Sequence, residues 1–205
     1  MKLRTVLFAA AALVIAQAAC LAQNPPAEDP SVTAVREYVK TAADYAEKQG
    51  SPHLIVADIS DYNQGSKPVW KKYASAEEFE NSREEEESYT TAYVWFQENV
   101  PVAVNFTYSS PSGDWALYVE YVFRVDGSVA GIRRELRTFQ GDVIVVKNYL
   151  FDEKGKKLKE TTEFFDLESE KPIPPKKDFA DMEVDLYKSV KELPFAEVLA
   201  ASRKQ

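Results

Sequence analysis

The feature that most constrains the fold is a long series of apolar and β-branched segments, beginning at Tyr89, that alternate with short turns. The predicted turns are Glu98-Asn99, Ser112-Gly113, Asp126-Gly127, Gln140-Gly141 and Lys154-Gly155. Segments arranged in this way pair with their neighbours in sequence and form an antiparallel meander. Because a two-residue turn fixes which residues face each other, the sequence also predicts the register of each hairpin.

The predicted register places the residues of six strands in rows that cross the sheet. Three rows share one face: Trp95, Val102, Phe123, Ala130, Phe151, Leu158; Tyr93, Val104, Tyr121, Ile132, Tyr149, Glu160; and Thr91, Phe106, Val119, Arg134, Lys147, Thr162. A slip of one residue would turn every side chain over, so this concentration of apolar side chains supports the register. On the opposite face Glu120 directly faces Arg133, which predicts a cross-strand ion pair on a solvated surface.

Helices are predicted on both sides of the meander. Apolar residues recur at helical spacing between Asp29 and Gly50, namely Val32, Val35, Val39, Ala42 and Ala46. Residues 53–60 read as a strand, and Ser75 with Glu78 forms a capping box that opens a short helix. After residue 177, Asp178 can cap a helix through Leu193, although the alternation of residues 182–186 also fits a strand, and Pro194 begins a last short helix.

These elements predict an α+β fold, a six- to seven-stranded twisted antiparallel β-meander flanked by N-terminal and C-terminal helices. We expect the N-terminal helix to cover the apolar face of the sheet, with the C-terminal segment as a second cover. A sheet of this kind curls into a half-barrel or cone that leaves a cavity between sheet and helices.

The first 22 residues have the pattern of an export signal, with basic residues at the start, an apolar run from Val6 to Ile15, and small residues up to Ala22. The apolar run is shorter than the about 20 residues that a membrane span needs. We therefore expect a signal peptide at 1–22, a linker at 23–29 and one α+β domain at 30–205, exported by a bacterium to the periplasm or secreted. In the alternative, cleavage before Cys20 gives a lipidated, membrane-anchored lipoprotein, although Gln17 departs from the usual lipoprotein motif.

The charge balance restricts the partners. Without residues 1–22 the chain keeps 23 basic and 33 acidic residues, a net charge of −10. Nucleic acids and anionic membranes attract basic surfaces, so neither is an expected partner, and a membrane contact is expected only through a lipid on Cys20. A small-molecule ligand or a protein partner of the cell envelope fits this balance.

One anomaly in the register predicts a ligand site. Arg134 and Lys147 project from the apolar face and stand opposite each other, although neighbouring like charges destabilise a sheet. A bound anion such as a carboxylate or phosphate would offset this repulsion, in a pocket that also includes Glu160, Tyr121, Tyr149 and Thr162. In the structural alternative, the two long side chains extend over the core to water or to an acidic partner, or a β-bulge moves one of them to the other face.

The preferred functional prediction is an exported, non-catalytic binding module that holds a small amphipathic or anionic ligand between sheet and helices. One alternative is an enzyme of hydrolase or isomerase type, in which Glu160 or Asp61 acts as acid or base and Tyr149 assists. The other is a protein-interaction module of the cell envelope. We assign no catalytic residue, metal or cofactor, because the one histidine, His53, lacks the partners that a metal site or catalytic triad requires.

Overall fold

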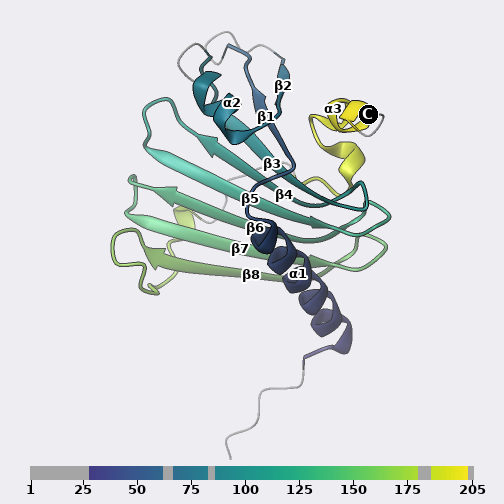
Figure 1. The fold of residues 1–205 in the computed structure, drawn as a ribbon. Helices are drawn as coiled ribbons and strands as arrows, with labels where there is room; N and C mark the ends of the chain where they lie inside the picture. The colour runs from purple at the N-terminus through teal and green to yellow at the C-terminus, as the bar shows by residue number, and fades with distance from the viewer. Residues whose placement is uncertain (1–27, 62–66, 83–85, 180–185, 203–205) are drawn as a thin grey trace, which may run out of the picture.

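An eight-stranded antiparallel sheet, with strand order β2-β1-β3-β4-β5-β6-β7-β8, organises the computed structural model, which describes residues 28–61, 67–82, 86–179 and 186–202 (Figure 1). The strands are β1 (Leu54–Asp58), β2 (Trp70–Tyr73), β3 (Thr90–Gln97), β4 (Val100–Ser109), β5 (Trp115–Phe123), β6 (Val129–Thr138), β7 (Val143–Phe151) and β8 (Lys157–Asp166). The helical elements are α1 (Pro30–Gln49), α2 (Ala76–Ser82), η2 (Lys177–Phe179), η3 (Val190–Glu192) and α3 (Ala196–Ser202). The predicted α+β class is confirmed. The sheet is wider than the expected six to seven strands because β1 joins it beside β3 and β2 joins it beside β1.

The predicted register is confirmed along most of the meander from β4 to β8. Tyr121 pairs with Val104 and Ile132, and Arg134 pairs with Lys147. The polar row is also continuous, and its members are Asn105, Glu120, Arg133, Asn148 and Thr161. The expected ion pair is present, with 3.4 Å between Arg133 Nη1 and Glu120 Oε1.

The register of β3 was predicted wrongly because a β-bulge lies in the first hairpin. Trp95 pairs with Ala103 while Phe96 pairs with Pro101, so Val102 is an extra residue in β4. Past an extra residue, every side chain of the partner strand points to the face opposite the one predicted without the bulge. Tyr93 and Thr91 therefore lie on the polar face, whereas Ala92 and Val94 point into the core.

Bulges recur at the same end of the other two hairpins. Ala130 in β6 and Leu158 in β8 are likewise extra residues, so the predicted pairs of Phe123 with Ala130 and of Phe151 with Leu158 were wrong. The positions of the extra residues, 102, 130 and 158, are 28 residues apart. The meander is thus a series of three hairpins with equivalent bulges.

The apolar face of the sheet is covered by the C-terminal segment, not by α1. Val190, Leu193, Phe195 and Leu199 are buried in one cluster with the apolar residues of the strands. The Phe195 ring lies 5.1 Å from that of Trp70, measured between centroids. The last short helix is present as α3, which begins at Ala196, two residues after the predicted start at Pro194. The helix expected from Asp178 to Leu193 was wrong over residues 186–189, which are not helical because Ser189 forms a β-bridge with Ser128, and only the short turn η3 follows them. Residues 180–185 of that prediction lie outside the described residues.

Helix α1 packs against the opposite face of the sheet, at the end where the bulges lie (Figure 1). Its limits agree with the prediction, since Asp29 caps the first turn by accepting a bond from the Ser31 amide at 2.8 Å and Gly50 follows the last residue. The expectation that α1 covers the apolar face was wrong, because the stripe on a helix shows which helix face is buried but does not identify the sheet face it meets. A small residue of β6, Gly131, provides the room for Val39 of α1.

Tyrosines of α1 bind the sheet at the bulges. The Tyr45 hydroxyl donates to the Phe96 carbonyl at 2.8 Å, and the Tyr38 hydroxyl donates to the Phe123 carbonyl at 3.1 Å. Each acceptor is the residue at which the register shifts. Buried carbonyl groups need hydrogen-bond partners, so these contacts both satisfy the bulged backbone and position α1.

The short helix α2 covers β1 and β2 on the same side of the sheet as α1. Phe79 of α2 is buried with Ile55 and Tyr73. The ring centroids of Phe79 and Tyr73 are 5.1 Å apart. The predicted capping box is present, because Ser75 Oγ accepts from the Glu78 amide at 3.1 Å. The Glu78 carboxylate reaches one residue further back than expected and accepts from the amide of residue 74.

Candidate functional site

The six residues predicted to bind a ligand lie on two adjacent rows of the sheet, but their exposure differs strongly. Tyr121 is fully buried, and Arg134 and Tyr149 are nearly so, with 7% and 6% of their surface exposed. Lys147 is half-buried, whereas Glu160 and Thr162 on β8 are exposed. Both rows therefore run from buried positions in the middle of the sheet to exposed positions on its edge strand, β8.

The pairings among these residues follow the prediction. Lys147 pairs with Thr162 and Tyr149 pairs with Glu160 across β7 and β8. Glu160 forms an ion pair with Lys157, whose ammonium lies 5.8 Å from the centroid of the Tyr149 ring. Glu160 thus stands at an exposed edge with a basic partner, whereas a general acid or base is usually found in a shielded site. The role of the six residues in ligand binding stays a prediction.

Tyr121 belongs to an aromatic cluster in the core. Its ring lies 5.8 Å from those of Phe106 and Phe123 and 5.7 Å from that of Tyr187, measured between centroids. Rings at these separations gain from edge and offset contacts in addition to burial. The Tyr121 side chain is therefore part of the packing that holds the C-terminal segment on the sheet.

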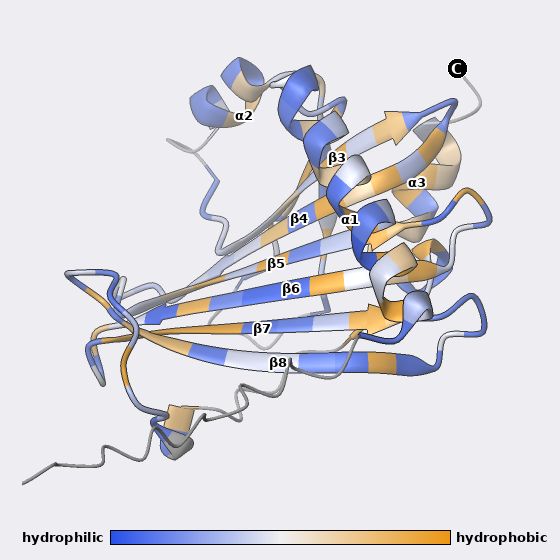
Figure 2. Ribbon diagram, turned by 90° about the horizontal axis from the view of Figure 1, so that it is seen from below, coloured by the Kyte–Doolittle hydropathy of each residue, from blue (hydrophilic) through white to orange (hydrophobic). Residues whose placement is uncertain are grey.

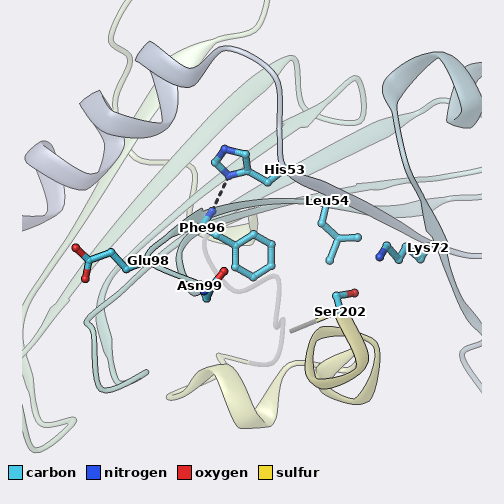
Figure 3. Close-up of a pocket in the computed structure, with 7 residues that line it drawn as sticks. All are labelled: His53, Leu54, Lys72, Phe96, Glu98, Asn99 and Ser202. Carbon is cyan, nitrogen blue, oxygen red and sulfur yellow. Dashed lines mark hydrogen bonds between the residues drawn. The ribbon is translucent and has the colours of Figure 1, made fainter. Parts of the chain in front are cut away.

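A hollow of about 430 Å³ lies between the sheet and α3, at the edge formed by β1, β2 and β3. It is open to solvent, and the residues that line it are His53, Leu54, Lys72, Phe96, Glu98, Asn99 and Ser202 (Figure 3). Leu54 and Phe96 supply an apolar floor, and Lys72 and Ser202 stand on its rim. Glu98 points away from the other side chains in this view.

The floor of the hollow depends on the first bulge. Phe96 follows the register shift, is half-buried and packs against the main core. Its amide donates at 2.9 Å to Nδ1 of His53, the residue just before β1 begins. The histidine that the sequence placed at the start of a strand therefore has a structural role, which is to extend the β1–β3 ladder by one hydrogen bond.

The turn beside the hollow has a backbone conformation that suits a tight hairpin. Glu98 and Asn99 both have positive φ values, 50° and 65°, as a two-residue turn of type I′ requires. This turn holds Asn99 at the rim, next to the Phe96 ring (Figure 3). The hollow thus combines an apolar floor with an ammonium, a hydroxyl and an amide, a combination that suits a small amphipathic molecule.

A second hollowed region lies on the polar face of the sheet. Helix α1 covers only one end of this face (Figure 2). Two adjoining hollows of about 490 and 290 Å³ share Arg133, Glu135 and Arg137 of β6. Glu135 Oε1 accepts from Arg137 Nε at 2.6 Å, and its other oxygen accepts from Arg133. Burial disfavours the Glu135 carboxylate, but the hydrogen bonds from Arg137 and Arg133 outweigh this and lower its pKa.

Within the described ranges, no group of three or more His, Cys, Asp or Glu side chains is placed to hold a metal ion. No helix in those ranges has the length and apolar character needed to cross a bilayer. The predicted export signal, with Cys20, lies outside the described residues. Comparisons with protein-family models, with curated proteins and with solved structures found no match for this chain.

A cavity between sheet and helices was expected from the sequence, but the residues that line the hollow beside α3 were not predicted, and neither was the hollowed region on the polar face. The α3 hollow is assembled from three strands, a turn and the last helix, which are far apart in the sequence. One signal was available, since Pro101 lies inside a strand, where proline is confined to edges and bulges. A bulge at this position would have placed Phe96 on the apolar side and shown that the first row of the register needed correction.

Proposed function

We propose that the protein is an exported, non-catalytic binding module that holds a small amphipathic ligand with an anionic group in the hollow between the sheet and α3. The observation that carries this proposal is the apolar floor of Leu54 and Phe96 beside the Lys72 ammonium. An apolar ligand body would cover the floor, and the anionic group would meet the Lys72 ammonium. Export is supported by the signal-like sequence of residues 1–22.

The chemistry of the hollow favours binding over catalysis. His53 uses Nδ1 to accept a backbone bond, and the Ser202 hydroxyl donates to the Val198 carbonyl at 2.9 Å. The residues that could act as base and nucleophile are thus engaged with the backbone of two different elements. A ligand with few polar groups is held well by such a site because burial of its apolar surface supplies most of the binding energy.

The proposal is tested by filling the hollow. Ser202→Phe places a ring over the floor, and the matched control, Ala201→Phe, places the same ring on the exposed neighbouring position of α3. The probe is 8-anilinonaphthalene-1-sulfonate, which has aromatic rings and one anionic group, and its fluorescence is followed in a titration. We expect saturable binding by the wild type and by Ala201→Phe, and loss of binding in Ser202→Phe.

Two further measurements decide the result. Lys72→Gln should weaken probe binding severalfold while near-ultraviolet circular dichroism stays unchanged, because the ammonium meets the sulfonate. Mass spectrometry of an organic extract of the protein, purified from cells that export it, should reveal a small amphipathic molecule that is absent from Ser202→Phe. Equal probe binding by Ser202→Phe and Ala201→Phe, both folded, would show that the hollow is not the site.

A further inference from the structure

We propose that the open part of the polar sheet face is a second binding site, which takes a neutral oligosaccharide. This face is bounded by α1, which lies across β4 to β8 at one end, and by α2, which covers β1 and β2. Between them the two hollows join across β6, because both are lined by Arg133, Glu135 and Arg137. The result is one groove that crosses the strands from β3 to β8.

The two halves of the groove offer the same kinds of group. One half contains Tyr118, with 38% of its surface exposed, and the Asn105 amide. The other contains Phe165, which is half-buried, and the Asn148 amide. Each half thus pairs an aromatic ring with a planar polar group. Sugar rings have apolar C–H faces that stack on aromatic rings and hydroxyl groups around their edges, so a repeated pattern of this kind suits successive sugar units.

The centre of the groove is held in a fixed arrangement. Glu135 has only 12% of its side chain exposed and accepts from both arginines, while Arg137 also donates to Glu170 at 2.9 Å. Side chains held in this way lose little conformational freedom on binding. The outer N–H groups of the arginines and the outer oxygens of the glutamates remain able to bind hydroxyls, which act as both donors and acceptors.

The charge of the groove excludes other classes of ligand. Its lining contains two arginines and four glutamates, Glu120, Glu135, Glu163 and Glu170, so the region is net acidic. An anionic polymer would be repelled. A peptide would find little to pair with its backbone, because β4 to β7 have strand neighbours on both sides and use their amide and carbonyl groups in the ladders.

The experiment measures glycan binding by the exported protein. The probes are an array of neutral glycans, followed by isothermal titration calorimetry with chitohexaose, cellohexaose, xylohexaose and maltohexaose. We expect at least one of these glycans to bind, Tyr118→Ala to weaken that binding about tenfold and Tyr118→Phe to retain it, because the ring carries the contact. The matched control is Phe139→Ala, which removes an aromatic ring from the β6–β7 turn. This residue is 69% exposed and lies outside the groove.

The outcomes separate this site from the one beside α3. Ser202→Phe should leave glycan binding unchanged, so failure of the first proposal does not affect the second. Added salt should change the affinity less than about twofold, since no ionic group of the ligand is involved. The proposal is overturned if the folded protein binds no glycan of the array, if Tyr118→Ala binds as well as the wild type, or if heparin binds in a salt-sensitive way in place of the neutral chains.

Discussion

The close approach of α1 to Gly131 allows a quantitative test of how the helix is held. A Cβ atom at position 131 would lie 2.6 Å from Val39 Cγ2 and 3.3 Å from Val39 Cγ1. Both distances are shorter than ordinary carbon contacts, which are about 3.5 to 4.0 Å. Valine is branched at Cβ and has one strongly preferred rotamer in a helix, so its methyl groups cannot turn away. Gly131→Ala must therefore push α1 from the sheet.

The expected cost follows from two opposing effects. Overpacking a well-filled contact costs about 1 to 3 kcal/mol. Replacing glycine by alanine also reduces the freedom of the unfolded chain, which stabilises the native state by about 0.4 to 1 kcal/mol. We expect Gly131→Ala to lower the free energy of unfolding by about 1 to 2 kcal/mol. Urea denaturation followed by tryptophan fluorescence measures this change.

A double-mutant cycle identifies the contact responsible. In a Val39→Ala background the clashing methyl groups are absent, so Gly131→Ala should be neutral or slightly stabilising, and the coupling between the two positions should exceed about 1 kcal/mol. The reasoning is refuted if Gly131→Ala is as stable as the wild type, or if its effect is the same whichever residue occupies position 39.

Two other predictions concern the attachment of α1. Tyr45→Phe leaves the Phe96 carbonyl without its hydroxyl donor and should lower the free energy of unfolding by about 1 kcal/mol, measured by the same urea titration. Glu28 binds Arg36 and Lys159, and hydrogen bonds from both lower its pKa from 4.5 to about 2. The stability that these bonds contribute is present above pH 4.5 and is lost as the pH falls through 2. The free energy of unfolding of the wild type should therefore exceed that of Glu28→Gln at pH 6 and equal it near pH 2. An equal difference at both pH values would contradict this.

The meander shows why most of the register could be predicted although the turns were assigned wrongly. In the second and third hairpins the turn has three residues, with Gly127 and Gly155 at positive φ, and each hairpin also contains a bulge. The longer turn shifts the register by one residue and the bulge shifts it back. The assumption of a two-residue turn and no bulge therefore gives the correct pairs for the body of the strands.

The first hairpin has no such compensation. Its turn does have two residues, Glu98 and Asn99, so the bulge at Val102 shifts β3 by one residue relative to β4. The face of β3 is therefore reversed in the prediction. Pro101 and Gly131 carried the missing information, because proline or glycine inside a strand is a sign of a bulge or a close backbone approach.

The candidate sites were harder to predict than the sheet for a physical reason. Register depends on neighbours in sequence, and local turn geometry determines it. The hollow beside α3 depends instead on where the C-terminal segment crosses the sheet, which places Ser202 in the same lining as Leu54 and Phe96. The unusual pair of Arg134 and Lys147 could be predicted because it depends on register alone, and it is present as a pair.

The equivalent bulges of the three hairpins have a consequence for how such a sheet can change in width. Equivalent positions, such as the extra residues Val102, Ala130 and Leu158, are separated by an even number of residues, 28, and each hairpin carries its own bulge. Gain or loss of one whole 28-residue hairpin would keep every remaining side chain on its present side of the sheet. Insertion of a single residue in a strand would reverse part of it. The chain is therefore organised so that duplication of a complete hairpin widens the sheet without rebuilding its core.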